Sequence, residues 1–117
     1  NNLEGRYAVS NQNILNSPMA EKADFVICQE LLEHLEDPDQ MVSRLFDSVK
    51  SGGWGYITAA INAGHIDHIY LYRKPEEVEA QITAAGWEIV DVQIESNYEE
   101  KPIEFRPTIV GYLTKKP

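Results

Sequence analysis

A short apolar run followed closely by a strong helix start constrains this chain more than any other feature. Residues 25–28 read Phe-Val-Ile-Cys with no polar residue among them, a pattern typical of a strand covered on both faces in a parallel sheet. Asp37, Pro38 and Gln40 then supply a capping side chain, a proline at the first helical position and a glutamine three residues after the cap. A strand that leads so soon into a helix predicts an α/β fold.

The same alternation continues to the end of the chain. Leucines at helical spacing predict a short helix over residues 29–35, and a second apolar stripe predicts a helix from Asp37 to about Lys50. Pro75 marks the start of another helix, which Gly86 closes. Strands are predicted over residues 54–60, 87–95 and 108–114. This order predicts parallel strands with a C-terminal antiparallel strand or hairpin.

Length and charge limit the classes of protein to consider. The 117 residues fit one domain, since domains typically hold about 100–200 residues. A net charge of −9 repels phosphate backbones, so we expect no nucleic-acid partner. No apolar run could span a bilayer and the first residues lack a signal-peptide pattern, so no membrane partner is expected. The single cysteine, Cys28, fits a reducing compartment, and we expect the cytoplasm.

Three segments carry a resemblance to a known family. Residues 23–38 join a hydrophobic strand to a Leu-Glu-His turn and an Asp-Pro helix start, residues 49–54 read Val-Lys-Ser-Gly-Gly-Trp, and residues 84–87 read Ala-Ala-Gly-Trp. In this order they resemble the signatures around strands four, five and six of class I S-adenosylmethionine-dependent methyltransferases. Ser51 replaces the family's usual proline, which is a mild departure. The resemblance covers about residues 23–116.

The first half of that family's fold has no counterpart in the sequence. No Gly-x-Gly-x-x-Gly motif occurs in the chain. We therefore interpret residues 1–117 as the C-terminal half of one methyltransferase domain, a partial Rossmann-like fold that we expect to be inactive alone. The absent strands would pair with the strand at residues 24–28. Its free edge leads us to expect that the fragment pairs with a second copy of itself.

Residues that follow a strand are the candidate ligand contacts. Ligands of open α/β sheets lie beyond the carboxyl ends of the strands, so Cys28, Gln29 and Glu30 should face the site. The resemblance implies S-adenosylmethionine as the cofactor, with Cys28 and Gln29 contacting it mainly through their backbone. It implies that Glu30 or His34 approaches the methionyl end of the cofactor. It also implies a contact from Asn13, or from one of the two residues before it, to the adenine amine.

Three histidines are candidates for a catalytic proton acceptor. The resemblance implies methyl transfer to a small-molecule acceptor, and a hydroxyl acceptor needs a base that titrates near neutral pH. His34 could serve, and its alternative role is to hydrogen-bond the backbone and fix the turn after the strand. His65 and His68 follow the next strand, where substrate would enter, and their alternative is a solvated loop. Oxygen, nitrogen and carbon acceptors all stay open.

Two other functions stay open at this level. The first is a noncatalytic methyltransferase-like module that binds a partner or dimerises. The second is a metal-dependent hydrolase that uses His65, Asp67 and His68, with Glu33 and His34 completing the site. The chain lacks a reinforcing ligand pattern such as His-Glu-x-x-His. We therefore expect no metal site.

Overall fold

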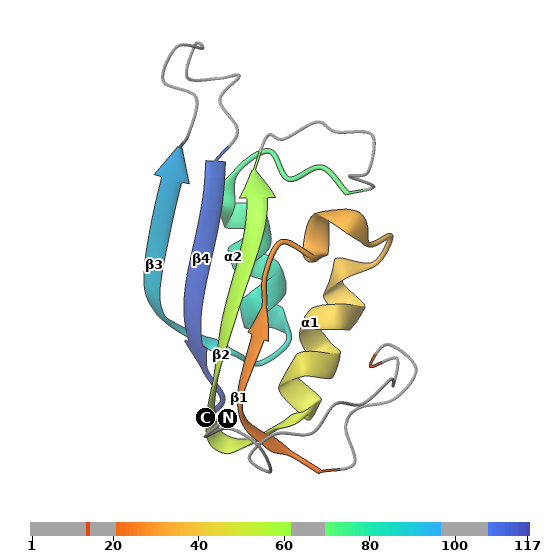
Figure 1. The fold of residues 1–117 in the computed structure, drawn as a ribbon, viewed down its shortest axis with the longest axis vertical. Helices are drawn as coiled ribbons and strands as arrows, with labels where there is room; N and C mark the ends of the chain where they lie inside the picture. The colour runs from red at the N-terminus through yellow and green to blue at the C-terminus, as the bar shows by residue number, and fades with distance from the viewer. Residues whose placement is uncertain (1–13, 15–20, 62–69, 97–107) are drawn as a thin grey trace, which may run out of the picture.

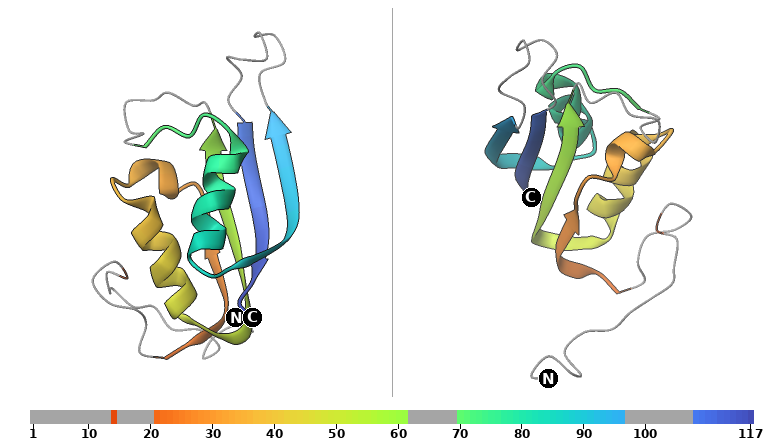
Figure 2. Two further views of the ribbon diagram at one scale, coloured as in Figure 1. Left: turned by 180° about the vertical axis from the view of Figure 1, so that it is seen from behind. Right: turned by 45° about the horizontal axis from the view of Figure 1, so that its top comes forward.

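Two helices pack on one face of a mixed sheet (Figures 1 and 2). The computed structural model describes residues 14, 21–61, 70–96 and 108–117. Its elements in chain order are β1 (Ala23–Cys28), the 3-10 turn η1 (Leu32–His34), α1 (Pro38–Asp47), β2 (Val49–Ile61), α2 (Pro75–Ala84), β3 (Glu88–Ser96) and β4 (Thr108–Lys115). Among these described elements, no helix has the length and apolar character needed to cross a membrane.

The last strand enters the middle of the sheet. The four strands lie in the order β1-β2-β4-β3. β1 and β2 are parallel, whereas β4 is antiparallel to both of its neighbours, β2 and β3. β1, β2 and β3 therefore run in one direction, and their carboxyl ends lie at the same edge of the sheet. The predicted α/β fold with parallel strands and a C-terminal antiparallel strand is confirmed.

Both helices begin where the sequence signals place them. The Asp37 side chain accepts a hydrogen bond from the Gln40 N–H at 3.2 Å, which satisfies one of the free donors at the start of α1. α2 starts at Pro75, as its proline predicts. Gly86 follows the end of α2 with a φ of +113°, a left-handed conformation that glycine adopts without steric cost.

The C-terminal end of α1 differs from the prediction. The helix ends at Asp47 rather than near Lys50, because the chain becomes extended at Val49, where β2 begins. Lys50 already belongs to β2, where its ammonium lies 3.4 Å from the Asp24 carboxylate of β1. The residues between the helix and the predicted strand therefore extend β2 instead of α1.

The short helix predicted over residues 29–35 is also wrong in extent. Only Leu32–His34 are helical, as the 3-10 turn η1. Glu30 has a φ of +52°, which a right-handed helix cannot accommodate. The chain thus turns sharply after β1 before η1 begins.

The core lies between the helices and the sheet, and Trp87 joins them. Its side chain is 2% exposed, and its indole N–H donates to the Val42 carbonyl of α1 at 3.3 Å. The ring meets Phe46 edge to face, with 5.3 Å between centroids. A Cβ added at Gly55 of β2 would lie 3.0 Å from the Trp87 ring, so the sheet approaches the indole as closely as glycine allows. Trp87 therefore packs against both α1 and β2.

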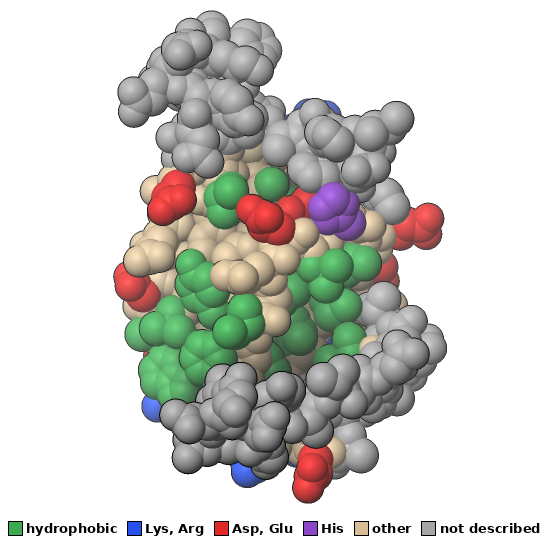
Figure 3. Space-filling model, in the orientation of Figure 1, with side chains coloured by type: hydrophobic (Ala, Val, Ile, Leu, Met, Phe, Trp, Pro, Cys, Tyr) green, Lys and Arg blue, Asp and Glu red, His purple; other side chains and the backbone are tan. Residues whose placement is uncertain are grey.

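The sheet face opposite the helices is open over the described part of the chain. Phe25 is 47% exposed and Ile27 is 63% exposed, and the space-filling view shows hydrophobic side chains gathered on this face (Figure 3). The expectation that this strand is covered on both faces is therefore wrong here. The reason is that α1 and α2 both pack on the other face (Figure 2).

Self-association through β1 stays a prediction. β1 is an end strand of the described sheet, and exposed apolar edge strands tend to pair with other chains. Sedimentation velocity should show a dimer for the unaltered chain and a monomer for Ile27→Lys, because the variant places a charge in the apolar contact. Val92→Lys, on the end strand β3, serves as the matched control and should remain dimeric. A monomeric unaltered chain would contradict the expectation.

Candidate functional site

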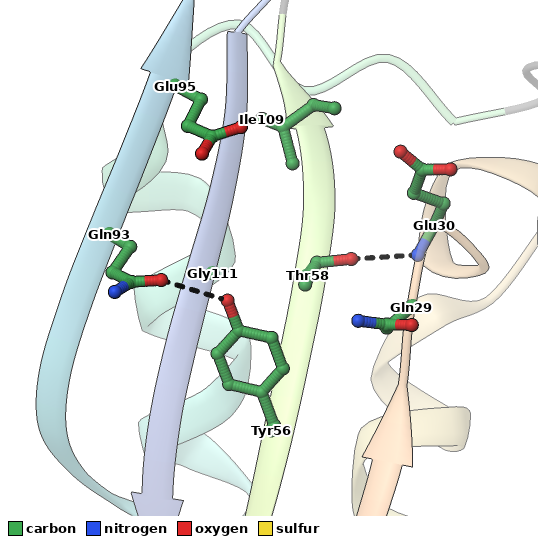
Figure 4. A pocket seen from close by; sticks show the side chains of 8 residues that line it. All are labelled: Gln29, Glu30, Tyr56, Thr58, Gln93, Glu95, Ile109 and Gly111. Atoms are coloured by element: carbon green, nitrogen blue, oxygen red, sulfur yellow. Dashed lines mark hydrogen bonds between the residues drawn. The ribbon is translucent and has the colours of Figure 1, made fainter.

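A pocket of about 320 Å³ opens on the uncovered face of the sheet, near the carboxyl end of β1 (Figure 4). The end of β1 and the strand β2 line it with Gln29, Glu30, Tyr56 and Thr58. β3 and β4 line it with Gln93, Glu95, Ile109 and Gly111. Six of these eight residues carry polar side chains. The pocket thus offers many hydrogen-bonding groups.

Glu30 is held in an unusual backbone conformation at one side of this pocket. Among the described residues, Glu30 is the only one other than glycine with a positive φ, at +52°. This conformation costs about 1–2 kcal/mol for a residue with a Cβ. The Glu30 N–H donates to the hydroxyl of Thr58 at 2.8 Å, and Thr58 is buried. The bond to β2 therefore fixes the backbone of Glu30 above the pocket.

Tyr56 forms part of the pocket floor. Its hydroxyl donates to the Gln93 side-chain oxygen at 3.4 Å, so the ring reaches across β4 from β2 to β3 (Figure 4). Gly111 lies beneath, and a Cβ there would come within 2.8 Å of the ring carbon that bears the hydroxyl. A side chain at position 111 would displace Tyr56. Glycine is therefore required for the ring to lie in this position.

The pocket is acidic. Glu30 and Glu95 contribute carboxylates from opposite sides, and the residues that line the pocket include no lysine, arginine or histidine. Both glutamates are exposed, so their charges act in a largely aqueous setting. The lining therefore favours neutral or positively charged ligands over anions.

Gln29 and Glu30 line the pocket, whereas the side chain of Cys28 does not. The contact of Gln29 and Glu30 with a cofactor stays a prediction. Cys28 is 4% exposed and belongs to the core between sheet and helices. Burial, followed by the negative charge of Glu33, raises the pKa of its thiol to about 11. The thiol is therefore protonated at neutral pH and unsuited to act as a nucleophile. A backbone contact from Cys28 to a cofactor stays a prediction.

His34 is placed at the end of η1 and is half-buried. The neighbouring Glu33 is 2% exposed, and its backbone carbonyl accepts a hydrogen bond from the Tyr70 N–H at 3.0 Å. This bond ties η1 to the segment that leads into α2. The bond is made by Glu33 and not by the His34 side chain, so the alternative role of His34, in which it fixes this turn, stays a prediction. The role of His34 as a base also stays a prediction.

Three of the proposed site residues, Asn13, His65 and His68, lie outside the described residues. The described flanks of the segment that holds both histidines are Ile61 and Tyr70, and Ile61 forms a parallel bridge with Tyr72. Among the residues that the structure describes, no group of three histidine, cysteine, aspartate or glutamate side chains could hold a metal ion.

Sequence reasoning missed the part of the pocket that comes from β3 and β4. Gln93 and Glu95 are two residues apart in the chain, and this spacing places them on one face of a strand. The alternation was visible in the sequence, but it did not reveal which face would be open. Tyr56 and Gly111 meet only because β4 pairs with β2.

Comparison with known proteins adds sequence evidence. A family model described as a methyltransferase domain matches residues 2–57. The chain is 30% identical over 89 residues to the ubiquinone biosynthesis O-methyltransferase of Burkholderia thailandensis, a match that covers 60% of this chain and 38% of that protein. It is 28% identical over 109 residues to the protein of the same name from Pseudomonas putida strain W619, covering 77% and 47% respectively. The chain thus spans less than half the length of these curated relatives.

Solved structures show the same fold. The N-methyltransferase NodS from Bradyrhizobium japonicum, in complex with S-adenosyl-L-homocysteine, superposes with a TM-score of 0.68 at 18% identity, covering 92% of this chain and 53% of NodS. The [4+2]-cyclase SpnF gives a TM-score of 0.72 at 15% identity, covering 92% of this chain and 55% of SpnF. Fold similarity alone therefore does not define the reaction, because SpnF is named as a cyclase.

The family match, the curated relatives and the fold together confirm the resemblance to class I S-adenosylmethionine-dependent methyltransferases. Among the curated relatives, the two described above are both O-methyltransferases of ubiquinone biosynthesis. The family model begins at residue 2, so the similarity also includes residues ahead of position 23, where sequence reasoning placed its start.

Proposed function

We propose that the chain forms the C-terminal half of a methyltransferase domain that moves a methyl group from S-adenosylmethionine to a small-molecule acceptor. The observation that carries the proposal is the position of Gln29 and Glu30. They follow directly on β1 of a methyltransferase-like sheet and open onto its polar pocket. Ligands of open α/β sheets lie beyond the carboxyl ends of the strands.

The residues of the described site fit a positively charged cofactor. S-adenosylmethionine supplies an electrophilic methyl group on a sulfonium sulfur when bound. Glu30, held by Thr58 at 2.8 Å, presents a carboxylate at this edge, and no cationic side chain lines the pocket. In the proposal, Gln29 and Glu30 bind near the methionyl end, and Asn13 contacts the adenine amine.

The chain's own part in catalysis is to orient the acceptor and accept its proton. An in-line displacement requires the attacking atom to be held opposite the leaving group. The names of the curated relatives favour an oxygen atom as the acceptor, and a hydroxyl must lose its proton as it attacks. We propose that His65 or His68 accepts this proton, with His34 as the third candidate.

Replacing the base should lower turnover strongly. In the protein extended to the start of its open reading frame, His65→Ala or His68→Ala should reduce methyl transfer about 10²–10⁴-fold. Binding of S-adenosylhomocysteine should stay within a few-fold, because the proposed base contacts the acceptor and not the cofactor. The assay follows S-adenosylhomocysteine formation with a panel of phenols and amines. Unchanged turnover in both variants would show that neither His65 nor His68 accepts the proton.

A noncatalytic module is the second candidate function. The open face with the exposed side chains of Phe25 and Ile27 favours it, because such a surface suits a protein partner. The methyltransferase and the noncatalytic module predict different sequences upstream of this chain in the open reading frame. A strand followed by a glycine-rich turn there would support the enzyme, whereas its absence would support the module.

A further inference from the structure

A buried polar network joins α2 to the chain directly ahead of it. Tyr72 is fully buried and Gln81 is 8% exposed. We propose that Gln81 is a positioning residue for methyl transfer. By bonding the hydroxyls of Tyr70 and Tyr72, it fixes the chain directly after the segment that carries the candidate bases. The inference rests on the proposed function, because those bases are His65 and His68.

The side-chain amide of Gln81 uses both of its polar atoms in this network. The Tyr72 hydroxyl donates to the Gln81 oxygen at 2.5 Å, and the Gln81 nitrogen donates to the Tyr70 hydroxyl at 3.4 Å. The two tyrosine rings pack together with 4.7 Å between their centroids. A single side chain of α2 therefore holds both tyrosines.

The backbone of both tyrosines is bonded to elements at the carboxyl ends of β1 and β2. The Tyr70 N–H donates to the Glu33 carbonyl of η1 at 3.0 Å. Tyr72 forms a parallel bridge with Ile61, the last residue of β2. Ligands of open α/β sheets lie beyond these strand ends. The network therefore holds the chain at the edge of the sheet where the proposed reaction takes place.

Packing alone does not require polar groups at these positions. Burial of a hydroxyl or an amide is unfavourable unless its hydrogen bonds are made. Phenylalanine at position 72 and leucine at position 81 would fill similar space without this requirement. The polar pair specifies one position of the chain, because a shifted Tyr72 would leave two buried polar groups unpaired. Such precision matters for a base, since a misplacement of about 1 Å can slow a reaction about 10²-fold.

Two variants of the extended protein separate positioning from stability. Gln81→Leu leaves both tyrosine hydroxyls without their amide partner, so we expect a lower urea midpoint and a kcat about 10–100-fold lower. Adding Tyr72→Phe removes the buried unpaired hydroxyl and should return the urea midpoint towards that of the unaltered protein. The kcat should stay low in this double variant, because Tyr70 still lacks its partner. The KM for S-adenosylmethionine should change by less than about twofold in both.

The assay follows S-adenosylhomocysteine formation with the phenol of the panel that the unaltered protein methylates fastest. Ile82→Val is the matched control, since Ile82 follows Gln81 on α2, is fully buried and has no polar group in its side chain. It should lower the urea midpoint and leave kcat within about twofold. Recovery of kcat together with the urea midpoint in the double variant would overturn the inference. So would an equal loss of kcat in Ile82→Val and Gln81→Leu.

Amide hydrogen exchange makes this inference separable from the proposed function. In the 117-residue chain, the Tyr70 N–H should exchange about tenfold faster in Gln81→Leu than in Ile82→Val, because the first variant loosens the chain at Tyr70 locally. Equal exchange in these two variants would overturn the inference, whether or not the extended protein is an enzyme. Absence of S-adenosylhomocysteine binding and of turnover in the unaltered extended protein would instead refute the proposed function, and with it a role of Gln81 in catalysis.

Discussion

Trp87→Ala should lower the free energy of unfolding by about 3–5 kcal/mol, the usual cost of truncating a buried large aromatic side chain. Trp87 is 2% exposed and touches elements from both layers. The variant loses the edge-to-face contact with Phe46 and leaves the Val42 carbonyl without its indole donor. Urea unfolding followed by circular dichroism measures the change. Since a domain of this size is stable by about 5–15 kcal/mol, the loss is a large fraction of the total.

Trp54→Ala is the matched control for this prediction. Trp54 is half-buried on β2, and its ring lies 5.3 Å from the Lys115 ammonium on the open face. Its truncation removes less buried surface, so we expect a loss of about 1 kcal/mol. Equal losses in the two variants would contradict the view that the core lies on the helix side of the sheet.

Stability should fall steeply as the pH rises above about 9. Burial is the main cause that raises the pKa of the Cys28 thiol from 9.0 to about 11, and burial likewise raises the pKa of the Tyr72 and Tyr112 hydroxyls above 10.0. Below pH 9 both the folded and unfolded forms keep these protons. Above it the unfolded chain ionises first, which lowers the free energy of unfolding by ~1.4 kcal/mol per pH unit for each group. Cys28 contributes between pH 9 and 11, and the tyrosines add to the slope above pH 10.

Two variants isolate the groups that cause this loss. Cys28→Ala should flatten the dependence between pH 9 and 10, where the tyrosines do not yet ionise. Tyr72→Phe should reduce the slope above pH 10 by ~1.4 kcal/mol per pH unit, although it also loses the hydrogen bond to Gln81 at 2.5 Å. Urea unfolding at pH 8 to 11 provides the measurement. A slope unchanged in both variants would show that other groups control the alkaline transition.

Local chemistry explains why the sequence predicted most elements of the fold. The cap at Asp37 and the proline at position 75 determine their helix starts through contacts within one turn. Family signatures then related residues 23–38, 49–54 and 84–87 to consecutive strands of a known fold, but the entry of β4 between β2 and β3 was not predicted. By contrast, α1 ends because β2 begins at Val49, so Gly52 and Gly53 further along the chain do not mark the end of the helix.

The pocket could be predicted only in part. Gln29 and Glu30 follow a recognisable strand, so their position beyond its carboxyl end follows from a general rule. Tyr56 and Gln93 are 37 residues apart and meet only through strand pairing. The left-handed backbone of Glu30 also depends on a distant group, the Thr58 hydroxyl 28 residues later. Such contacts have no periodicity that a single sequence displays.

The open face was the largest difference between expectation and structure. An apolar run such as residues 25–28 indicates burial, but it does not say what covers each face. Here Cys28 faces the core and Ile27 is 63% exposed.

Calorimetric titration with S-adenosylhomocysteine tests the central claim most directly. The two samples are the 117-residue chain and the same protein extended to the start of its open reading frame. The account predicts binding by the extended protein and none by the chain alone, because the glycine-rich turn that the resemblance assigns to cofactor binding has no counterpart in this sequence. Absence of binding in both samples would contradict the methyltransferase proposal.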